Sequence, residues 1–305
     1  MNPVQYITVT EDNDNQRLDN FLRTQLKGVP KSMLYRIIRK GEIRVNKKRY
    51  DASDKIYTND IIRIPPLRMS EDKPEDRMLA DSQKAMLQTM IIFENDQFMV
   101  VNKPAGLAVH AGSGVSQGLI ELLRRFKTIY KKAELVHRLD RGTSGCLLIA
   151  KKMSALKIFH QMFRTGAVTK IYTALVKGYW PAKLHYLDAC LQKNILQSGE
   201  RMVKVDPRGQ NAATTFRILK RLPDTTLVSA ELHTGRTHQI RVHALHAGFP
   251  IVGDEKYGDK LFNKSMAERG IKRMCLHATQ LSFIWPESKQ KFEFNVPVAE
   301  MFFQN

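Results

Sequence analysis

Helical and extended hydrophobic patterns alternate in the first 66 residues of the chain. Apolar residues recur at intervals of three and four, the spacing of one helix face, from residue 17 onwards and again over residues 32–40. The inward positions of these two helices are Leu18, Phe21, Leu22, Met33, Leu34, Ile37 and Ile38. Ser32 stands where it can cap the second helix, and alternating patterns predict short strands around residues 43–45 and 61–65. The pattern therefore predicts a small two-helix module over residues 17–66.

The rest of the chain divides into polar stretches and one long segment rich in strands. Residues 1–16 form an N-terminal lead-in. Residues 67–89 carry mixed charges without apolar periodicity, which predicts a linker that ends in a short helix around residues 80–87. Beyond it, helices are expected over residues 118–126 and 154–163. The expected strands cover residues 90–94, 98–102, 146–150, 170–178, 212–219, 226–232 and 292–296. We therefore expect an α+β protein in which residues 90–305 form a mixed, mainly antiparallel β-sheet with flanking helices.

The composition adds a strong basic bias to this picture. Lys and Arg number 49 against 30 Asp and Glu, a formal net charge of +19, and 43% of the 305 residues are hydrophobic. Such a chain can bury a core and favours a polyanionic partner, with nucleic acid ahead of a membrane surface because no basic amphipathic helix stands out. No apolar run approaches the roughly 20 residues of a membrane span, and no signal pattern opens the chain. We expect a cytoplasmic protein without membrane contacts.

The spacing of the cysteines and the absence of known cofactor motifs limit the reactions that the sequence favours. Cys146, Cys190 and Cys275 are widely spaced among apolar residues, and no two of them form a C-x-x-C pair. This arrangement predicts buried reduced thiols rather than a disulfide framework or a zinc site. The Walker A, dinucleotide-binding, H-E-x-x-H and G-x-S-x-G patterns do not occur, so nothing in the sequence calls for a cofactor.

Basic residues concentrate in the small module. Residues 31–49 contain eight basic residues and one acidic residue, a local net charge of +7. This density predicts a face that binds phosphates, and the alternative is a basic surface that is only solvated. Through its R-L-D-N-F-L, K-S-x-x-x-R-I-I-R-K-G and I-R-V-N sequences, the module resembles the S4 (αL-type) RNA-binding domain. By that resemblance, the residues that contact RNA are Lys31, Ser32, Arg36, Lys40 and Lys47.

A glycine-punctuated loop over residues 136–145 carries a single carboxylate, Asp140, between Arg138 and Arg141. The loop leads directly into the buried strand predicted over residues 146–150, a placement that suits a catalytic acid. The alternative is a loop aspartate in surface ion pairs, which are common in proteins. The loop alone leaves both interpretations open.

Four histidines fall within residues 233–246 and suggest a metal site at first sight. Their spacings of five, five and three fit neither a strand face nor a helical pair, except partly at His243 and His246. We therefore expect no metal and interpret the interleaved arginines as donors to anions such as RNA phosphates. A metal-dependent RNA hydrolase that uses His233, His238 and His243 is an alternative.

Four motifs occur in the order found in the RluA family of pseudouridine synthases, which the chain resembles over nearly its whole length. They are H-R-L-D-x-x-T-S-G at residues 137–145, K-x-Y-x-A at 170–174, T-G-R-T-H-Q-I-R-V-H at 234–243 and R-M-C-L-H-A at 273–278. The resemblance implies an isomerisation without a cofactor, in which the N1–C1′ bond of uridine breaks, the uracil turns over and C5 joins C1′. The implied substrate is large-subunit (23S) ribosomal RNA, and we expect a monomer.

The same resemblance assigns roles to five residues. Asp140 is the catalytic aspartate, which captures or stabilises the sugar at C1′ or abstracts a ribose proton, and Arg241 forms a salt bridge that keeps it ionised. Tyr172 lies against the uracil and can relay the proton that leaves C5, and Leu276 contacts the base. Arg138 fills the gap that remains when the uridine is flipped out of its stack.

The other polar residues of these motifs receive a structural interpretation. We expect His137, His238 and His277 to orient loops by hydrogen bonds, and we expect Ser144 to lack the histidine partner that a nucleophile needs. The main alternative to an enzyme is a ribosome-assembly factor that binds RNA through the same surfaces without catalysis.

Overall fold

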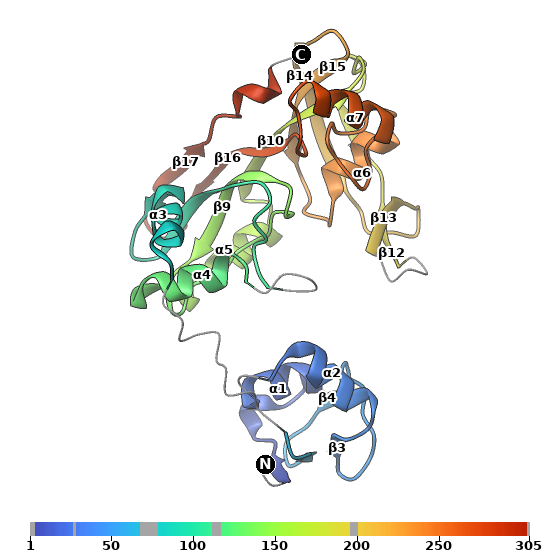
Figure 1. Ribbon diagram of the computed structural model, residues 1–305. Coiled ribbons are helices and arrows are strands. Elements are labelled where there is room, and N and C mark those ends of the chain that lie inside the picture. Colours follow the sequence, from blue (N-terminus) through green and yellow to red (C-terminus); the bar gives the residue numbers. More distant parts are fainter. Residues whose placement is uncertain (1–3, 27–28, 68–78, 112–116, 196–200, 304–305) are drawn as a thin grey trace. The chain divides into compact units, whose positions relative to one another are not determined.

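The computed structural model describes residues 4–26, 29–67, 79–111, 117–195 and 201–303. The chain divides into two compact units, Met1–Arg77 and Met78–Asn305, and each unit has its own hydrophobic core (Figure 1). None of the helices in the described ranges has the length and apolar character needed to span a membrane.

The first unit is a two-helix module with short strands. Its helices are α1 (Leu18–Gln25) and α2 (Lys31–Arg39), and its strands are β1 (Gln5–Thr8), β2 (Gln16–Arg17), β3 (Arg44–Val45), β4 (Lys55–Ile56) and β5 (Ile61–Ile64). The strands pair in the order β1–β5–β3, with a separate β2–β4 pair. Six of the seven predicted inward positions are buried, and Met33 packs partly buried against the same core. The predicted helix faces are therefore confirmed.

The start of α2 differs from the prediction. The helix begins at Lys31, and its N-cap is Pro30, whose φ of −57° and ψ of 139° are those of extended backbone. The proline ring fixes φ and removes an N–H donor that a helix start cannot pair, so a helix can follow it directly. The predicted cap at Ser32 is therefore wrong, since Ser32 lies in the first turn.

A buried carboxylate, Asp19, joins the two helices of this unit. Asp19 accepts hydrogen bonds from the Arg17 guanidinium at 3.1 and 2.8 Å and from the Tyr35 hydroxyl on α2 at 2.6 Å. The hydrogen bond from Arg17, helped by that from Tyr35, outweighs the effect of burial and lowers the pKa of Asp19 to about 2.

Asp19→Asn should therefore destabilise the first unit at neutral pH more than in acid. Because the folded pKa lies below the ordinary value of 3.8, the carboxylate stabilises the fold fully above that value and loses this contribution as the pH falls towards 2. We expect faster amide hydrogen exchange in α1 and α2 of the variant at about pH 6, and a difference from the wild type that shrinks below about pH 4. A difference that stays constant with pH would contradict an ionic contribution.

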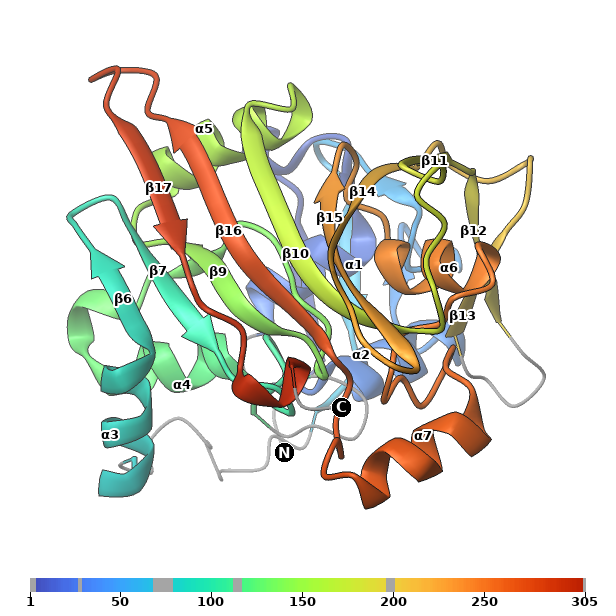
Figure 2. The same ribbon diagram turned by 90° about the horizontal axis from the view of Figure 1, so that it is seen from above.

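The second unit is built on one ten-stranded sheet, whose path runs β11–β14–β15–β10–β16–β9–β7–β6, with β17 paired to β16 and β8 to β9. The strands are β6 (Ile91–Glu94), β7 (Phe98–Lys103), β8 (Glu134–Leu135), β9 (Ser144–Ala150), β10 (Val168–Lys177), β11 (Tyr186–Asp188), β14 (Ala213–Arg221), β15 (Thr225–Leu232), β16 (Leu276–Ile284) and β17 (Lys291–Asn295). Figure 2 shows β17, β16, β10 and β15 side by side. Among the described strands, β9 and β16 pair in parallel and the other pairs are antiparallel. The predicted mixed, mainly antiparallel sheet is therefore confirmed.

Helices flank this sheet. They are α3 (Asp81–Met90), α4 (Leu119–Phe126), α5 (Met153–Arg164), α6 (Gln239–His246) and α7 (Lys260–Glu268), with 3₁₀ turns at Glu11–Asn13 in the first unit and at Thr128–Tyr130 and Glu300–Phe302 in the second. The helices predicted over residues 118–126 and 154–163 are confirmed as α4 and α5. The predicted linker is too long at its C-terminal end, because α3 packs its buried Leu87 and Met90 into the core of the second unit. A separate hairpin is formed by β12 (Leu191–Ile195) and β13 (Arg201–Val205), and β13 packs near α6.

Gly145 permits the close parallel approach of β9 to β16. Its φ is +106°, and a Cβ at this position would lie 2.2 Å from the carbonyl oxygen of Ala278. Any other residue would strain the backbone and push the two strands apart. The glycine thus brings the loop that ends at β9, which carries Asp140, close to Leu276 at the start of β16.

The three cysteines are free thiols, but they differ in environment. Cys146 and Cys275 are buried, and burial raises the pKa of each thiol to about 12. Cys190 is partly exposed between β11 and β12, with its Sγ 3.4 Å from Oδ1 of Asn211. The prediction of buried thiols is therefore wrong for Cys190, which lies in the connection between two strands rather than within a buried strand.

Candidate active site

The five residues to which the sequence assigned catalytic and base-contacting roles line one cavity of about 240 Å³ in the second unit. They come from separate elements: Arg138 and Asp140 from the loop before β9, Tyr172 from β10, Arg241 from α6 and Leu276 from β16. Arg138 is exposed at this site, whereas Tyr172, Arg241 and Leu276 are buried. The cavity is thus lined by a carboxylate, a phenol, apolar surface and several cations.

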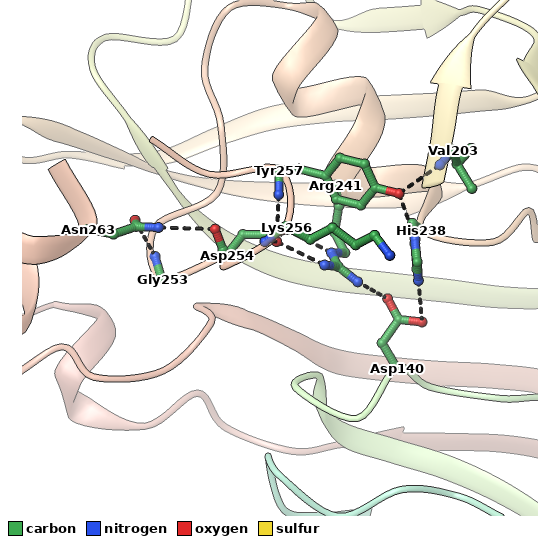
Figure 3. Close-up of polar contacts among 9 residues, drawn as sticks. All are labelled: Asp140, Val203, His238, Arg241, Gly253, Asp254, Lys256, Tyr257 and Asn263. Atoms are coloured by element: carbon green, nitrogen blue, oxygen red, sulfur yellow. Dashed lines mark hydrogen bonds and ion pairs between the residues drawn. The ribbon is translucent and has the colours of Figure 1, made fainter. Parts of the chain in front are cut away.

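Arg241 bridges two carboxylates (Figure 3). Its Nη1 donates to Oδ2 of Asp140 at 2.8 Å, while Nε and Nη2 donate to the two oxygens of Asp254 at 2.7 and 2.8 Å. The guanidinium also lies 4.9 Å from the centre of the Tyr257 ring. Burial lowers the pKa of Arg241, but hydrogen bonds and charges from Asp254 and Asp140 raise it above its ordinary value. Arg241 therefore stays positively charged, and its guanidinium is held by Asp254 at Nε and Nη2 and by Asp140 at Nη1.

Asp254 is the inner member of this pair of carboxylates. Its side chain is completely buried, whereas that of Asp140 is 20% exposed and faces the cavity. Burial raises the pKa of Asp254, yet hydrogen bonds from Arg241 and from the backbone N–H groups of Tyr257 and Lys256 hold it below the ordinary range. Asp254 can therefore anchor Arg241, and Asp140 is the carboxylate that a substrate can reach.

Tyr172 presents a protonated phenol to the cavity. Burial, followed by the negative charge of Asp140, raises the pKa of Tyr172 above its ordinary value. The phenol therefore keeps its proton at neutral pH, and its ring can lie against a planar base. Leu276, at the start of the neighbouring strand β16, adds apolar surface to the same cavity.

Two cations near Asp140 were not identified as functional residues from the sequence. Lys170 lines the cavity, with its Nζ 5.4 Å from the centre of the Phe163 ring, and burial lowers the pKa of this lysine. Lys103 is buried and donates to the carbonyl oxygens of Pro104, Leu107 and Arg141 at 2.8, 2.8 and 3.3 Å. Burial lowers the pKa of Lys103 to about 8, although the charge of Asp140 opposes this effect. Lys103 therefore fixes the backbone next to Asp140.

A further residue missed by sequence reasoning is Asp254. Its signal is the stretch Gly253-Asp254-Glu255-Lys256-Tyr257-Gly258, a glycine-bounded acidic turn that follows two buried apolar residues. The K-P-A-G turn after β7 is the corresponding signal for Lys103. Neither stretch indicates which residue it contacts, because the contacts with Arg241 and with the Arg141 carbonyl depend on how the loops close in the fold.

His137 and His277 form hydrogen bonds, as was expected for the histidines of the motifs. Nε2 of His137 accepts the backbone N–H of Leu148 at 3.0 Å, the ring stacks on Phe163, and burial lowers the pKa of His137 to about 3. His277 bonds to the Val296 carbonyl at 3.1 Å. These contacts hold loops and strand ends in place.

The expectation for Ser144 is wrong. Its Oγ lies 2.8 Å from Nδ1 of His277, so the serine does have a histidine partner. The pair was missed because the two residues meet only through the parallel pairing of β9 with β16, 133 positions apart. Both are buried, neither lines the cavity, and Arg273 donates to Ser144 at 3.1 Å. The serine is thus engaged in a buried network that a substrate in the cavity does not contact.

The histidines considered as metal ligands point to different partners. His233 bonds to Thr215, His238 to Tyr257, and His243 to Thr214 and to the Ala189 carbonyl. In the part of the chain that the structure describes, no three His, Cys, Asp or Glu side chains form a group that could hold a metal ion. The geometry therefore does not favour the metal-dependent hydrolase.

The residues expected to contact RNA lie in the first unit. Arg36 and Lys40 are exposed at the C-terminal end of α2, and Lys47 is exposed in a turn where its φ is +67°. The side chains of Lys31 and Ser32 lie outside the described part of the structure.

The chain is similar to known proteins in both units. Residues 97–246 match the RNA pseudouridylate synthase family, and residues 16–62 match the S4 domain. Ribosomal large subunit pseudouridine synthase C of Haemophilus influenzae is 49% identical over 294 residues, 96% of this chain and 91% of that protein. The Escherichia coli K12 protein of the same name is 48% identical over 300 residues, 97% of this chain and 94% of that protein.

The fold is also found in solved structures. Human RNA pseudouridylate synthase domain containing 4 superposes with a TM-score of 0.59 at 22% identity, covering 74% of this chain and 96% of that one. Human RNA pseudouridylate synthase domain containing 1 gives a TM-score of 0.55 at 26% identity, covering 68% and 82%. With the curated relatives matched over nearly their whole length, the chain belongs to the RNA pseudouridylate synthase family and carries an S4 domain at its N-terminal end.

Proposed function

We propose that the chain converts specific uridines of large-subunit ribosomal RNA to pseudouridine, with Asp140 as the catalytic residue. The observation that carries the proposal is the bridge from Arg241 to Asp140 and to the buried Asp254, at the wall of a cavity that also contains Tyr172. Arg241 keeps a reachable carboxylate ionised and in place. Support for the substrate comes from the relatives named ribosomal large subunit pseudouridine synthase C.

The proposed reaction balances without a cofactor or a metal. The N1–C1′ bond breaks, the uracil turns over, C5 bonds to C1′, and the proton on C5 leaves while N1 gains one. Asp140 either bonds to C1′, stabilises its positive charge or abstracts a ribose proton. Tyr172 lies against the uracil and relays the C5 proton, and Leu276 contacts the base. Arg138, exposed at the cavity, fills the gap left by the flipped uridine.

The S4 unit is proposed to hold ribosomal RNA through Lys31, Ser32, Arg36, Lys40 and Lys47. Support comes from the local net charge of +7 over residues 31–49 and from the exposure of Arg36, Lys40 and Lys47. The chain is also proposed to act as a monomer. A ribosomal RNA substrate fits a cytoplasmic location.

Incubation of the purified chain with unmodified large-subunit ribosomal RNA in the presence of a chelator tests this function. We expect pseudouridine in intact RNA. RNA that is bound but unmodified would support the non-catalytic assembly factor, and cleaved RNA would point to a hydrolase.

Removal of residues 1–66 should weaken RNA binding and leave the chemistry at Asp140 intact. Each phosphate contact that is lost lowers the slope of log affinity against log salt by about 0.7 to 0.9, so the slope should fall by several such steps. The matched comparison in the full chain is a variant with Arg36→Gln, Lys40→Gln and Lys47→Asn, because asparagine tolerates the positive φ of position 47. Lys55→Gln, at an exposed lysine of the same unit, serves as its control. An unchanged slope in the triple variant would contradict the proposed RNA contacts.

A further inference from the structure

Tyr257 links the β12–β13 hairpin to the catalytic carboxylate (Figure 3). Its hydroxyl oxygen accepts the backbone N–H of Val203, on β13, at 2.9 Å and lies 2.8 Å from Nδ1 of His238. On the other side of the ring, Nε2 of His238 lies 3.8 Å from Oδ1 of Asp140. Two side chains, those of Tyr257 and His238, therefore lie between the backbone of β13 and Asp140.

The donors and acceptors of this chain fit one arrangement. The carboxylate of Asp140 only accepts hydrogen bonds, so it favours a proton on Nε2 of His238. Nδ1 is then a bare nitrogen that must accept, and the Tyr257 hydroxyl, whose oxygen already accepts from Val203, donates to it. The hydroxyl thus selects the imidazole tautomer that points an N–H at Asp140.

The same tyrosine also supports the other partner of Asp140. The Arg241 guanidinium lies 4.9 Å from the centre of the Tyr257 ring, and Arg241 donates to Oδ2 of Asp140. The hydroxyl and the ring of Tyr257 therefore serve different oxygens of one carboxylate. His238 itself is the N-cap of α6 and has a left-handed backbone, with φ of +55°, which directs its side chain into the site.

The hairpin that holds the hydroxyl borders a second cleft next to the catalytic cavity. This cleft, of about 410 Å³, is lined by Val203 and by basic side chains including Arg208 and Arg236, and it shares Gly235, Arg236 and Thr237 with the catalytic cavity. The Tyr257 hydroxyl is therefore hydrogen-bonded to a residue that lines this second cleft.

We propose that Tyr257 and His238 are positioning residues: the Tyr257 hydroxyl, held by the backbone of β13, fixes the His238 tautomer whose Nε2–H faces Oδ1 of Asp140. The proposal rests on Asp140 being the catalytic residue. Its consequence is that the Tyr257 hydroxyl acts on the reaction through His238, so removal of the hydroxyl or of the His238 ring interrupts the same path.

A double-mutant cycle tests this path. Tyr257→Phe keeps the ring beside Arg241 and removes only the hydroxyl, and His238→Asn keeps a residue that tolerates positive φ but is too short to bridge Tyr257 and Asp140. We expect each variant to lower kcat by about tenfold with KM for RNA changed less than about twofold, and the double variant to be no worse than either single variant. Effects that multiply, or a kcat that does not change, would overturn the proposal.

Two further variants separate positioning from general damage. Tyr186→Phe removes an exposed hydroxyl outside the site and should leave kcat unchanged. Tyr257→Leu removes the ring as well and should lower kcat further than Tyr257→Phe, because Arg241 also loses its support. Equal losses in the Leu and Phe variants would contradict the separate role of the hydroxyl and the ring.

A nitrogen-15 NMR spectrum of the His238 ring gives a readout that does not depend on activity. We expect Nδ1 to be unprotonated and Nε2 protonated in the wild type, and the two tautomers to mix in Tyr257→Phe. A proton on Nδ1 in the wild type would overturn the proposal. If the wild type has this tautomer but forms no pseudouridine, the proposed function fails while the positioning of the ring stands.

Discussion

Asp140→Asn is expected to abolish pseudouridine formation, with kcat at least ~1,000-fold lower and RNA affinity within about twofold of the wild type. Asparagine has the shape of aspartate but cannot bond to C1′ as a carboxylate, balance a positive charge there or accept a ribose proton. It therefore removes every role considered for this residue. Product would be measured as pseudouridine in digested RNA, and affinity by titration of the same RNA.

The fold should survive this change. Arg241 keeps its two hydrogen bonds to the buried Asp254, and Asp140 is the partly exposed one of the two carboxylates that Arg241 bridges. Asp224→Asn is the control, because Asp224 forms an exposed ion pair with Arg269 away from the cavity. Substantial conversion by Asp140→Asn would show that another group performs the chemistry.

Arg241→Met should both unfold the second unit more easily and stop the reaction. Asp254 is completely buried, and a buried charge that loses its partner destabilises a protein by about 3–5 kcal/mol. Asp140 also loses its cation. Arg241→Lys should recover part of the stability, because an ammonium can bond to one carboxylate but cannot form the fork that bridges both. Urea unfolding followed in the second unit measures the stability.

Two comparison variants separate the effect of Arg241 on stability from its effect on activity. Arg217→Met removes an exposed ion pair with Glu231 and should change the stability by no more than about 0.5 kcal/mol. Arg241→Met combined with Asp254→Asn removes the buried charge, so stability should return in part while activity stays lost. Activity that returned together with stability would contradict a direct role of Arg241 at Asp140.

Hydrophobic periodicity predicted the elements whose position follows from burial. The apolar run 146–150 forms the C-terminal part of β9, and the spacing of Leu18, Phe21 and Leu22 gives the buried face of α1. Burial of apolar side chains is the largest favourable term in folding. The buried positions of a helix or strand are therefore apolar and recur at its period, a pattern that can be recognised in the sequence. The start of α2 was misplaced because the fixed φ of Pro30 decides it, not the capping preference of Ser32.

The residues of the site were predictable from the sequence only where they belong to the family motifs. Arg241 and Asp140 are 101 positions apart, and the motif resemblance, rather than any local pattern, paired them. Asp254 and Lys103 were missed because a buried polar residue is recognised by its partners, and those partners are set by strand pairing and loop closure. The Ser144–His277 pair was missed for the same reason.

The central claim is that the carboxylate of Asp140 catalyses the isomerisation of uridines in large-subunit ribosomal RNA. The most direct test maps pseudouridine at single-nucleotide resolution in ribosomal RNA from cells that lack this chain, complemented with the wild type or with Asp140→Asn. We predict that specific large-subunit sites are modified with the wild type and remain uridine with the variant, although both proteins accumulate equally. Identical maps from the two strains would contradict the claim.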